Sequence, residues 1–150
     1  MEYIYFTGPD GSKIEMPVCG DPVSLHIRCS CLKQFSQVKT TIIVREAFGD
    51  LQTVLTLSSG DAPLALHEGM NEIVLSLPFL GLQSGLYSLK IGLTTAMLEH
   101  VAAMESFRFT VGNNQRTQHC LFYQPCEWKV TSGPEAEVPV LTQPTAQGSK

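Results

Sequence analysis

Apolar and polar residues alternate along most of this chain with a period of two. In residues 23–31 every second residue is apolar, and the residues between them are polar or charged. Residues 77–93 read as the end of one strand, a short connection containing Pro78, Gly81 and Gly85, and a second alternating strand. Successive side chains of a strand point to opposite faces, so this pattern predicts strands that bury one face. We interpret residues 77–93 as a corner between two strands.

Similar runs with turn signals between them predict further strands. These lie at residues 3–6, 12–16, 38–44, 51–57, 70–77, 106–111 and 119–123. Residues 62–69 read as a loop, and residues 94–104 fit either a short helix or an irregular hairpin loop. About eight short strands at this spacing predict an all-β fold, an antiparallel two-sheet sandwich of immunoglobulin-like or jelly-roll type.

Length and composition favour one domain. The chain has 150 residues, of which 43% are hydrophobic and 16% charged, enough for one core of ordinary size. We expect the sandwich to occupy residues 1–130. From Ser132 onward the sequence is rich in Gly, Pro, Glu, Thr and Gln without periodicity, so residues 131–150 are expected to form a disordered tail.

The charge balance argues against nucleic acid as a partner. The formal net charge is −4, the sequence pI is about 5.5, and the ten Lys and Arg residues form no run. No apolar stretch approaches the ~20 residues of a membrane-spanning helix, and the start Met1-Glu-Tyr-Ile4 does not resemble a signal peptide. A soluble cytoplasmic protein is the expectation.

The cysteines and histidines suggest neither a metal site nor a cofactor. Five cysteines without a signal peptide predict reduced thiols. Cys29 and Cys31 are two apart in a predicted strand, a spacing that suits two core residues and does not suit zinc. No G-x-S-x-G, H-E-x-x-H or paired-carboxylate motif occurs, although a triad from distant positions stays open. We therefore expect a binding module, not an enzyme.

Candidate binding residues come from the outward positions of the predicted strands and from two aromatic residues near the end of the sandwich. The polar side chains can bond to hydroxyl groups or pair with an anion, and the aromatic rings can lie against the apolar side of a sugar ring. The candidates are His26, Arg28, Ser30, Arg45, Lys90, Arg108, Tyr123 and Trp128.

The order of several short motifs resembles a known family. The run Leu77-Pro-Phe-Leu-Gly-Leu-Gln-Ser-Gly-Leu-Tyr-Ser-Leu-Lys-Ile-Gly-Leu93 is similar to a strand of the C-terminal carbohydrate-binding domain of Wzt, the ATPase subunit of ABC transporters for O-antigen polysaccharide. Other segments match the family in the same order. They are residues 23–31, Arg45-Glu-Ala-Phe-Gly-Asp50, Gly69-Met-Asn-Glu-Ile-Val74, Ser106-Phe-Arg-Phe-Thr-Val111 and Phe122-Tyr-Gln-Pro-Cys-Glu-Trp128. The resemblance covers about residues 1–130.

This resemblance implies an immunoglobulin-like sandwich that recognises finished O-antigen polysaccharide, often at its modified non-reducing end. It also implies a homodimer that exchanges a last strand, here Thr117 to Tyr123, with Gly112-Asn-Asn114 as the hinge. The transporter membrane subunit would be a partner through the full-length protein, at the inner face of the bacterial inner membrane. The chain has no Walker motif, so ATPase activity would reside in a separate N-terminal domain.

The residues leave the ligand and the class of function open. An anionic terminal group would suit Arg28, Arg45, Lys90 and Arg108, whereas a methyl group would suit Tyr123 or Trp128. The alternative function is an immunoglobulin-like protein-protein interaction domain without glycan binding, which would dock a partner on an exposed edge strand.

Overall fold

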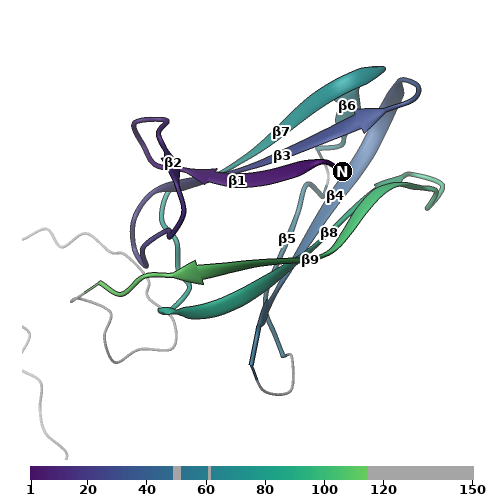
Figure 1. The fold of residues 1–150 in the computed structure, drawn as a ribbon. Helices are drawn as coiled ribbons and strands as arrows, with labels where there is room; N and C mark the ends of the chain where they lie inside the picture. The colour runs from purple at the N-terminus through teal and green to yellow at the C-terminus, as the bar shows by residue number, and fades with distance from the viewer. Residues whose placement is uncertain (49–51, 61, 115–150) are drawn as a thin grey trace, which may run out of the picture.

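A computed structural model describes residues 1–48, 52–60 and 62–114 of the chain. This part contains nine strands and no helix, so the all-β prediction is confirmed (Figure 1). The strands are β1 (Tyr3–Thr7), β2 (Lys13–Ile14), β3 (Val23–Cys31), β4 (Phe35–Glu46), β5 (Thr53–Ser58), β6 (Leu64–Leu66), β7 (Gly69–Leu77), β8 (Gly85–Thr95) and β9 (His100–Val111).

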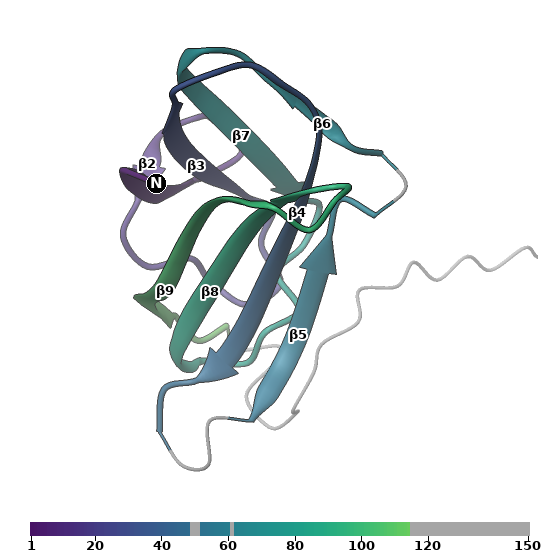
Figure 2. The same ribbon diagram turned by 90° about the vertical axis from the view of Figure 1, so that its right-hand side faces the viewer.

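The strands form two antiparallel sheets that pack as a sandwich. The first sheet has the order β2-β1-β3-β7, and the second has the order β5-β4-β8-β9 with β6 also paired to β4. Figure 2 shows β9, β8, β4 and β5 side by side in the second sheet. Residues 62–69 contain β6, so the loop prediction there is wrong. Leu66 is buried and pairs with Phe35, which holds this segment against the second sheet.

Residues 77–93 form the predicted corner, and the corner links the two sheets. β7 ends at Leu77 in the first sheet, and β8 begins at Gly85 in the second. Leu80 and Leu82 are buried in the connection, and the Leu80 backbone exchanges hydrogen bonds of 2.9 and 2.8 Å with Asp21 and Gly20. The crossing segment is therefore part of the core.

The alternation of the sequence defines the core correctly. The inner rows include Leu25, Ile27, Ile42, Val44, Leu89 and Ile91, all buried between the sheets. Tyr87 and Leu93 are buried on the same face of β8, and Phe109 and Val111 on β9. Cys29 and Cys31 are buried free thiols, as the sequence predicted. Burial of these aliphatic and aromatic side chains is what stabilises the two layers against each other.

Residues 94–104 belong to a β-hairpin and do not form a helix. β8 continues to Thr95, and β9 starts at His100, so most of this range lies in strands and not in the helix or loop that the sequence predicted. The turn is closed by hydrogen bonds between Thr95 and Glu99 and from Leu98 to Thr95. Leu98 has a φ of 62°, a left-handed conformation that is costly for a side chain other than glycine.

The end of β9 is fixed to the segment that precedes β3. Val18 and Gly112 form a parallel bridge, and the Gly112 amide donates to the Pro17 carbonyl at 2.8 Å. The predicted hinge at 112–114 thus begins at an anchored residue. No helix that could cross a membrane occurs in the part of the chain that the structure describes.

Candidate functional site

The predicted binding residues lie on opposite outer faces of the sandwich. His26, Arg28 and Ser30 are on β3, on the face of the first sheet that points away from the core of the sandwich. Arg45, Lys90 and Arg108 are on the outer face of the second sheet, and Tyr123 and Trp128 lie outside the described residues. The structure therefore brings together three of the eight predicted residues in one group and two others, His26 and Arg28, in another.

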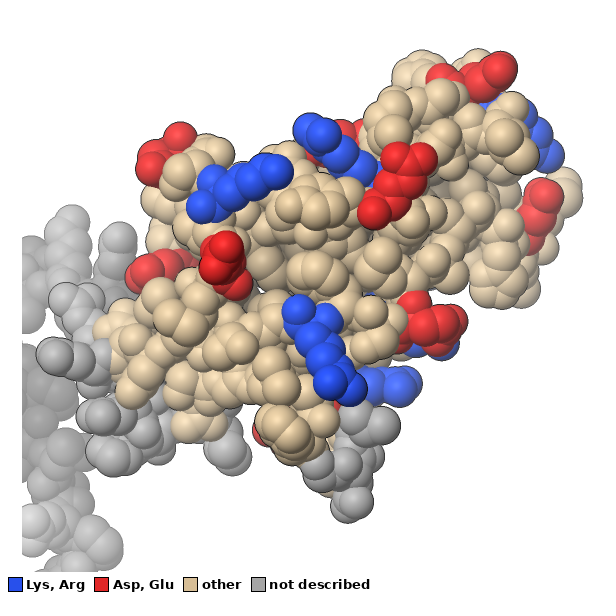
Figure 3. All heavy atoms as spheres, viewed as in Figure 1, with Lys and Arg blue, Asp and Glu red and all other residues tan. Residues whose placement is uncertain are grey.

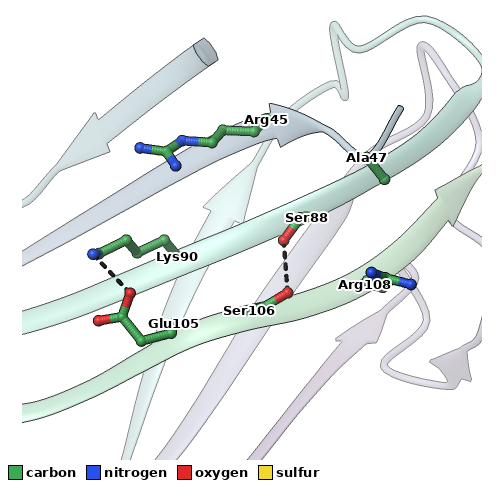
Figure 4. Close-up of a pocket in the computed structure, with 7 residues that line it drawn as sticks. All are labelled: Arg45, Ala47, Ser88, Lys90, Glu105, Ser106 and Arg108. Atoms are coloured by element: carbon green, nitrogen blue, oxygen red, sulfur yellow. Dashed lines mark hydrogen bonds and ion pairs between the residues drawn. The ribbon is translucent and has the colours of Figure 1, made fainter. Parts of the chain in front are cut away.

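The outer face of the second sheet carries a hollow of about 230 Å³. The lining residues come from β4, the residue after it, β8 and β9, and they are Arg45, Ala47, Ser88, Lys90, Glu105, Ser106 and Arg108 (Figure 4). We call this group the second-sheet hollow.

Strand register explains why these side chains meet. Arg45 on β4 pairs with Ser88 on β8, and Ser88 pairs with Arg108 on β9. Side chains directly opposite each other on antiparallel strands have Cβ atoms about 4.5–5.5 Å apart and share a face. One row across three strands thus presents two guanidinium groups, those of Arg45 and Arg108, with Ser88 between them.

A register shift in β9 adds two more polar residues to the same face. Leu89 pairs with Phe107 and Ile91 with Met104, so two residues of β9, Glu105 and Ser106, lie opposite Lys90. Such a bulge lets neighbouring residues both point outward. Lys90 Nζ lies 2.7 Å from Glu105 Oε2, and the hydroxyls of Ser88 and Ser106 are 3.0 Å apart.

The cations of the hollow differ in their partners. Lys90 is paired with Glu105, whereas neither Arg45 nor Arg108 forms an ion pair with a described residue. The Nε atom of Arg45 is buried and has no hydrogen-bond partner within residues 1–48, 52–60 and 62–114. Figure 4 shows Arg45 and Arg108 on either side of the Ser88–Ser106 pair. Two guanidinium groups are thus available to a ligand that bears hydroxyl or acidic oxygens.

Glu105 and Ser106 line the hollow but are not among the residues that the sequence predicted. A signal for them exists: Met104 and Phe107 both face inward although they are three residues apart, which breaks the period of two. Ser88 alternates with the buried Tyr87 and Leu89 and faces outward, but it is not among the predicted contacts. Its role depends on the neighbours that the sheet order gives it.

The second group of predicted residues forms a network on the first sheet, in which His26 Nδ1 lies 3.6 Å from Glu72 Oε1 and is buried without a hydrogen-bond partner among the described residues. Glu72 Oε1 accepts hydrogen bonds from the Tyr5 hydroxyl at 2.7 Å and from Arg28 Nε at 2.9 Å. The His26 ring stacks on Tyr5 with centroids 4.5 Å apart, and its Nε2 lies 2.9 Å from Thr7 Oγ1. The predicted donors Arg28 and His26 are therefore already engaged with their own chain.

Titration in this network follows the hydrogen bonds. The bonds from Tyr5 and Arg28 stabilise the ionised carboxylate and hold the pKa of Glu72 below its usual range. The same bond to Glu72 raises the pKa of the Tyr5 hydroxyl.

Lys13 Nζ lies 4.5 Å from the centroid of the Tyr5 ring and 5.0 Å from that of Tyr3, so a cation already covers both rings.

Charges of both signs are mixed over the surface. Figure 3 shows positive and negative side chains interspersed on one face of the molecule, without a continuous basic patch. Among the described residues, no three His, Cys, Asp or Glu side chains gather closely enough to hold a metal ion.

Comparisons with known proteins identify the fold. No protein-family model matches the chain, and no curated protein matches it in sequence. The crystal structure of the C-terminal domain of Wzt superposes with a TM-score of 0.60 and 12% identity, over 87% of this chain and 81% of that one. The PmoD soluble domain from Methylocystis sp. ATCC 49242 (Rockwell) gives a TM-score of 0.45 and 19% identity, over 73% of this chain and 90% of that one. The chain thus has the β-sandwich fold of the C-terminal domain of Wzt, to which its sequence motifs point.

Proposed function

We propose that this chain is a non-catalytic glycan-recognition module that binds O-antigen polysaccharide at its modified non-reducing end. In this role it selects finished chains for export by an ABC transporter. The observation that carries the proposal is the second-sheet hollow, in which Arg45 and Arg108 have no ion-pair partner among the described residues. The shared fold with the C-terminal domain of Wzt supports the same function.

The size and position of the hollow favour the end of a polymer. Its volume of about 230 Å³ is below the ~300–1,000 Å³ of ligand pockets that enclose drug-sized molecules. A terminal unit with its substituent is a better match for this volume than several consecutive sugars. The remaining chain can leave the open sheet face without entering the protein.

The charges favour an acidic substituent on that terminal unit. Lys90 is held by Glu105 and Arg28 by Glu72, so Arg45 and Arg108 remain as donors for an anion. A guanidinium group presents two parallel N–H donors that match a carboxylate or phosphate. The hydroxyls of Ser88 and Ser106 lie between them and can bond to the sugar.

The partners of the module rest on the resemblance to Wzt. We place the chain at the cytoplasmic face of the bacterial inner membrane, joined to the transporter membrane subunit through the full-length protein. We also propose a homodimer that exchanges the strand from Thr117 to Tyr123, which lies outside the described residues. A chain ending at residue 116 that remained a dimer in sedimentation would contradict the exchange.

Calorimetric titration with capped and uncapped polysaccharide tests the proposed function. The wild-type chain is expected to bind the capped form in a saturable way and the uncapped form weakly. Arg45→Gln and Arg108→Gln each remove a charge-assisted bond worth about 1.5–3 kcal/mol, which corresponds to about a 10- to 100-fold loss of affinity. Arg28→Gln is the matched control on the first sheet and should bind like the wild type. Equal binding by all four proteins, or none to either glycan, would overturn the proposal and favour a protein-interaction domain.

A further inference from the structure

The core of the sandwich is open along the edge formed by β5 and β7. These strands end their sheets on the same side of the sandwich, and within residues 1–48, 52–60 and 62–114 they have one neighbouring strand each (Figure 2). Their inward-facing residues Leu57, Ile73 and Leu75 are only half-buried, whereas Ile27 and Ile42, on the inner strands, are buried. The aliphatic interior therefore reaches the surface at this edge.

A groove of about 300 Å³ lies along this edge, between the two inner sheet faces. Among the residues that the structure describes, its wall is aliphatic apart from a few hydroxyl groups and contains no charged residue. The lining residues are Ile27, Thr40, Ile42, Leu57, Ser58, Ser59, Ala62, Leu64, Ile73, Val74 and Leu75. The groove is distinct from the second-sheet hollow: Thr40 is on the inner face of β4, whereas Arg45 is on the outer face of the same strand.

Thr40 gives this groove a polar feature that the fold does not satisfy. Its side chain is 5% exposed, and Oγ1 is buried without a hydrogen-bond partner among the described residues. The Thr40 backbone is fully used: the amide donates to Ser59 Oγ at 2.9 Å, and the carbonyl accepts from the Ser59 amide at 3.0 Å. Buried hydroxyl groups normally have a partner, and none of the described residues supplies one here.

The lining determines which chemistry fits. Aliphatic walls favour an aliphatic chain, because apolar surface is stabilised by leaving water. A charged group beside Thr40 would lose its hydration without meeting an opposite charge, so the polar group of the ligand must be neutral.

We propose that this groove is a second ligand site, which takes an aliphatic chain bearing one neutral hydrogen-bonding group, such as an alcohol or an ester, and that Thr40 Oγ1 binds that group. The described lining residues come from β3, β4, β5, β6 and β7, together with Ser59 and Ala62 between β5 and β6. It is independent of glycan binding, because it shares no residue with the second-sheet hollow.

The test is an NMR titration of the full chain with 1-octanol, followed at the methyl groups of Leu57, Ile73 and Leu75. The wild-type chain is expected to show saturable shifts at these methyl groups, and octyltrimethylammonium, which is charged and has no hydrogen-bonding group, is expected to bind more weakly. Thr40→Val keeps the shape and removes the hydroxyl, so the affinity for 1-octanol should fall about three- to tenfold. Thr56→Val is the matched control, because Thr56 is exposed on β5 and does not line the groove.

A second variant tests the location without touching the core. Ala62 is exposed at the rim, and Ala62→Phe should fill the entrance and lower the 1-octanol affinity more than tenfold. Thermal melts confirm that each variant is folded. Absence of saturable shifts in the wild-type chain would overturn the proposal. Equal affinities of Thr40→Val and Thr56→Val for 1-octanol would also overturn the proposal, because the Thr40 hydroxyl would then make no hydrogen bond to the ligand.

Discussion

Lys90 and Glu105 form an ion pair across β8 and β9, with Nζ and Oε2 2.7 Å apart. The pair exists because the register shift in β9 turns Glu105 to the outer face beside Ser106. The Glu105 carboxylate neutralises Lys90, which the sequence predicted to bind an anionic group of the ligand. Arg45 and Arg108 are then the cations of the second-sheet hollow that remain for a ligand.

Removing the carboxylate of this pair should strengthen binding of an acidic glycan. Glu105→Gln leaves Lys90 positive and takes away a charge that repels the ligand. A charge at about 4 Å is worth about 1 kcal/mol in water, so affinity should rise by up to about fivefold at low salt. Both side chains are largely exposed, so the free energy of unfolding should change by less than about 1 kcal/mol. Calorimetry at two salt concentrations measures the glycan affinity, and Glu99→Gln is the control. Weaker glycan binding by Glu105→Gln than by the wild type would contradict this prediction.

The Tyr87 hydroxyl is expected to stabilise the corner between the sheets. It donates to the Gln83 carbonyl at 2.9 Å from a side chain that is 5% exposed, in the manner of the tyrosine corner of immunoglobulin-like folds. Tyr87→Phe leaves this carbonyl without its partner, which should lower the free energy of unfolding by about 1–3 kcal/mol. Urea denaturation measures the change. Tyr3→Phe is the control, because Tyr3 is 49% exposed; equal loss in both variants would contradict the assignment.

Stability should depend on pH through Glu72. Its pKa is lowered in the folded chain, first by the Tyr5 hydrogen bond and then by Arg28. A lowered carboxyl pKa adds stability that is complete above the usual Glu pKa of about 4.3 and is lost as the pH falls through the folded value. The melting temperature of the wild type should therefore exceed that of Glu72→Gln near neutral pH, and the two should converge in acid. Glu68→Gln, whose carboxylate has no partner among the described residues, should follow the wild type at every pH. A constant difference between wild type and Glu72→Gln would refute the linkage.

The core thiols should resist alkylation in the folded chain. Cys19, Cys29 and Cys31 are at most 5% exposed, and burial together with the neighbouring Cys31 raises the pKa of Cys29. The thiolate is the reactive form, so both access and ionisation slow the reaction. Peptide mapping after iodoacetamide treatment should show these three residues unmodified in buffer and modified in urea. Rapid labelling of Cys29 in buffer would show that the core opens easily.

The sequence predicted individual strands better than it predicted their neighbours. Residues 23–31 match β3 at both ends, because one buried face imposes a strict period of two. β6 was missed because three residues are too few for alternation to be recognised. Residues 94–104 stayed ambiguous because a second register shift, where Leu93 pairs with Ala102 and Thr94 with His100, interrupts the period.

The candidate site depends on contacts that a single sequence does not encode locally. Arg45 and Arg108 meet because β8 lies between β4 and β9, a matter of sheet order. Arg28 loses its availability to Glu72, which is 44 positions away along the chain. Outward alternation identifies which side chains are exposed, whereas their grouping on one face or the other follows from the tertiary structure.

The proposed glycan site is the second-sheet hollow. Two-dimensional amide NMR of the labelled chain, titrated with a polysaccharide fragment carrying its terminal modification, tests it most directly. Saturable shifts are expected at Ser88, Lys90, Ser106 and Arg108, which line the hollow. Shifts concentrated at Tyr5, His26 and Arg28, with the second-sheet hollow unchanged, would contradict it.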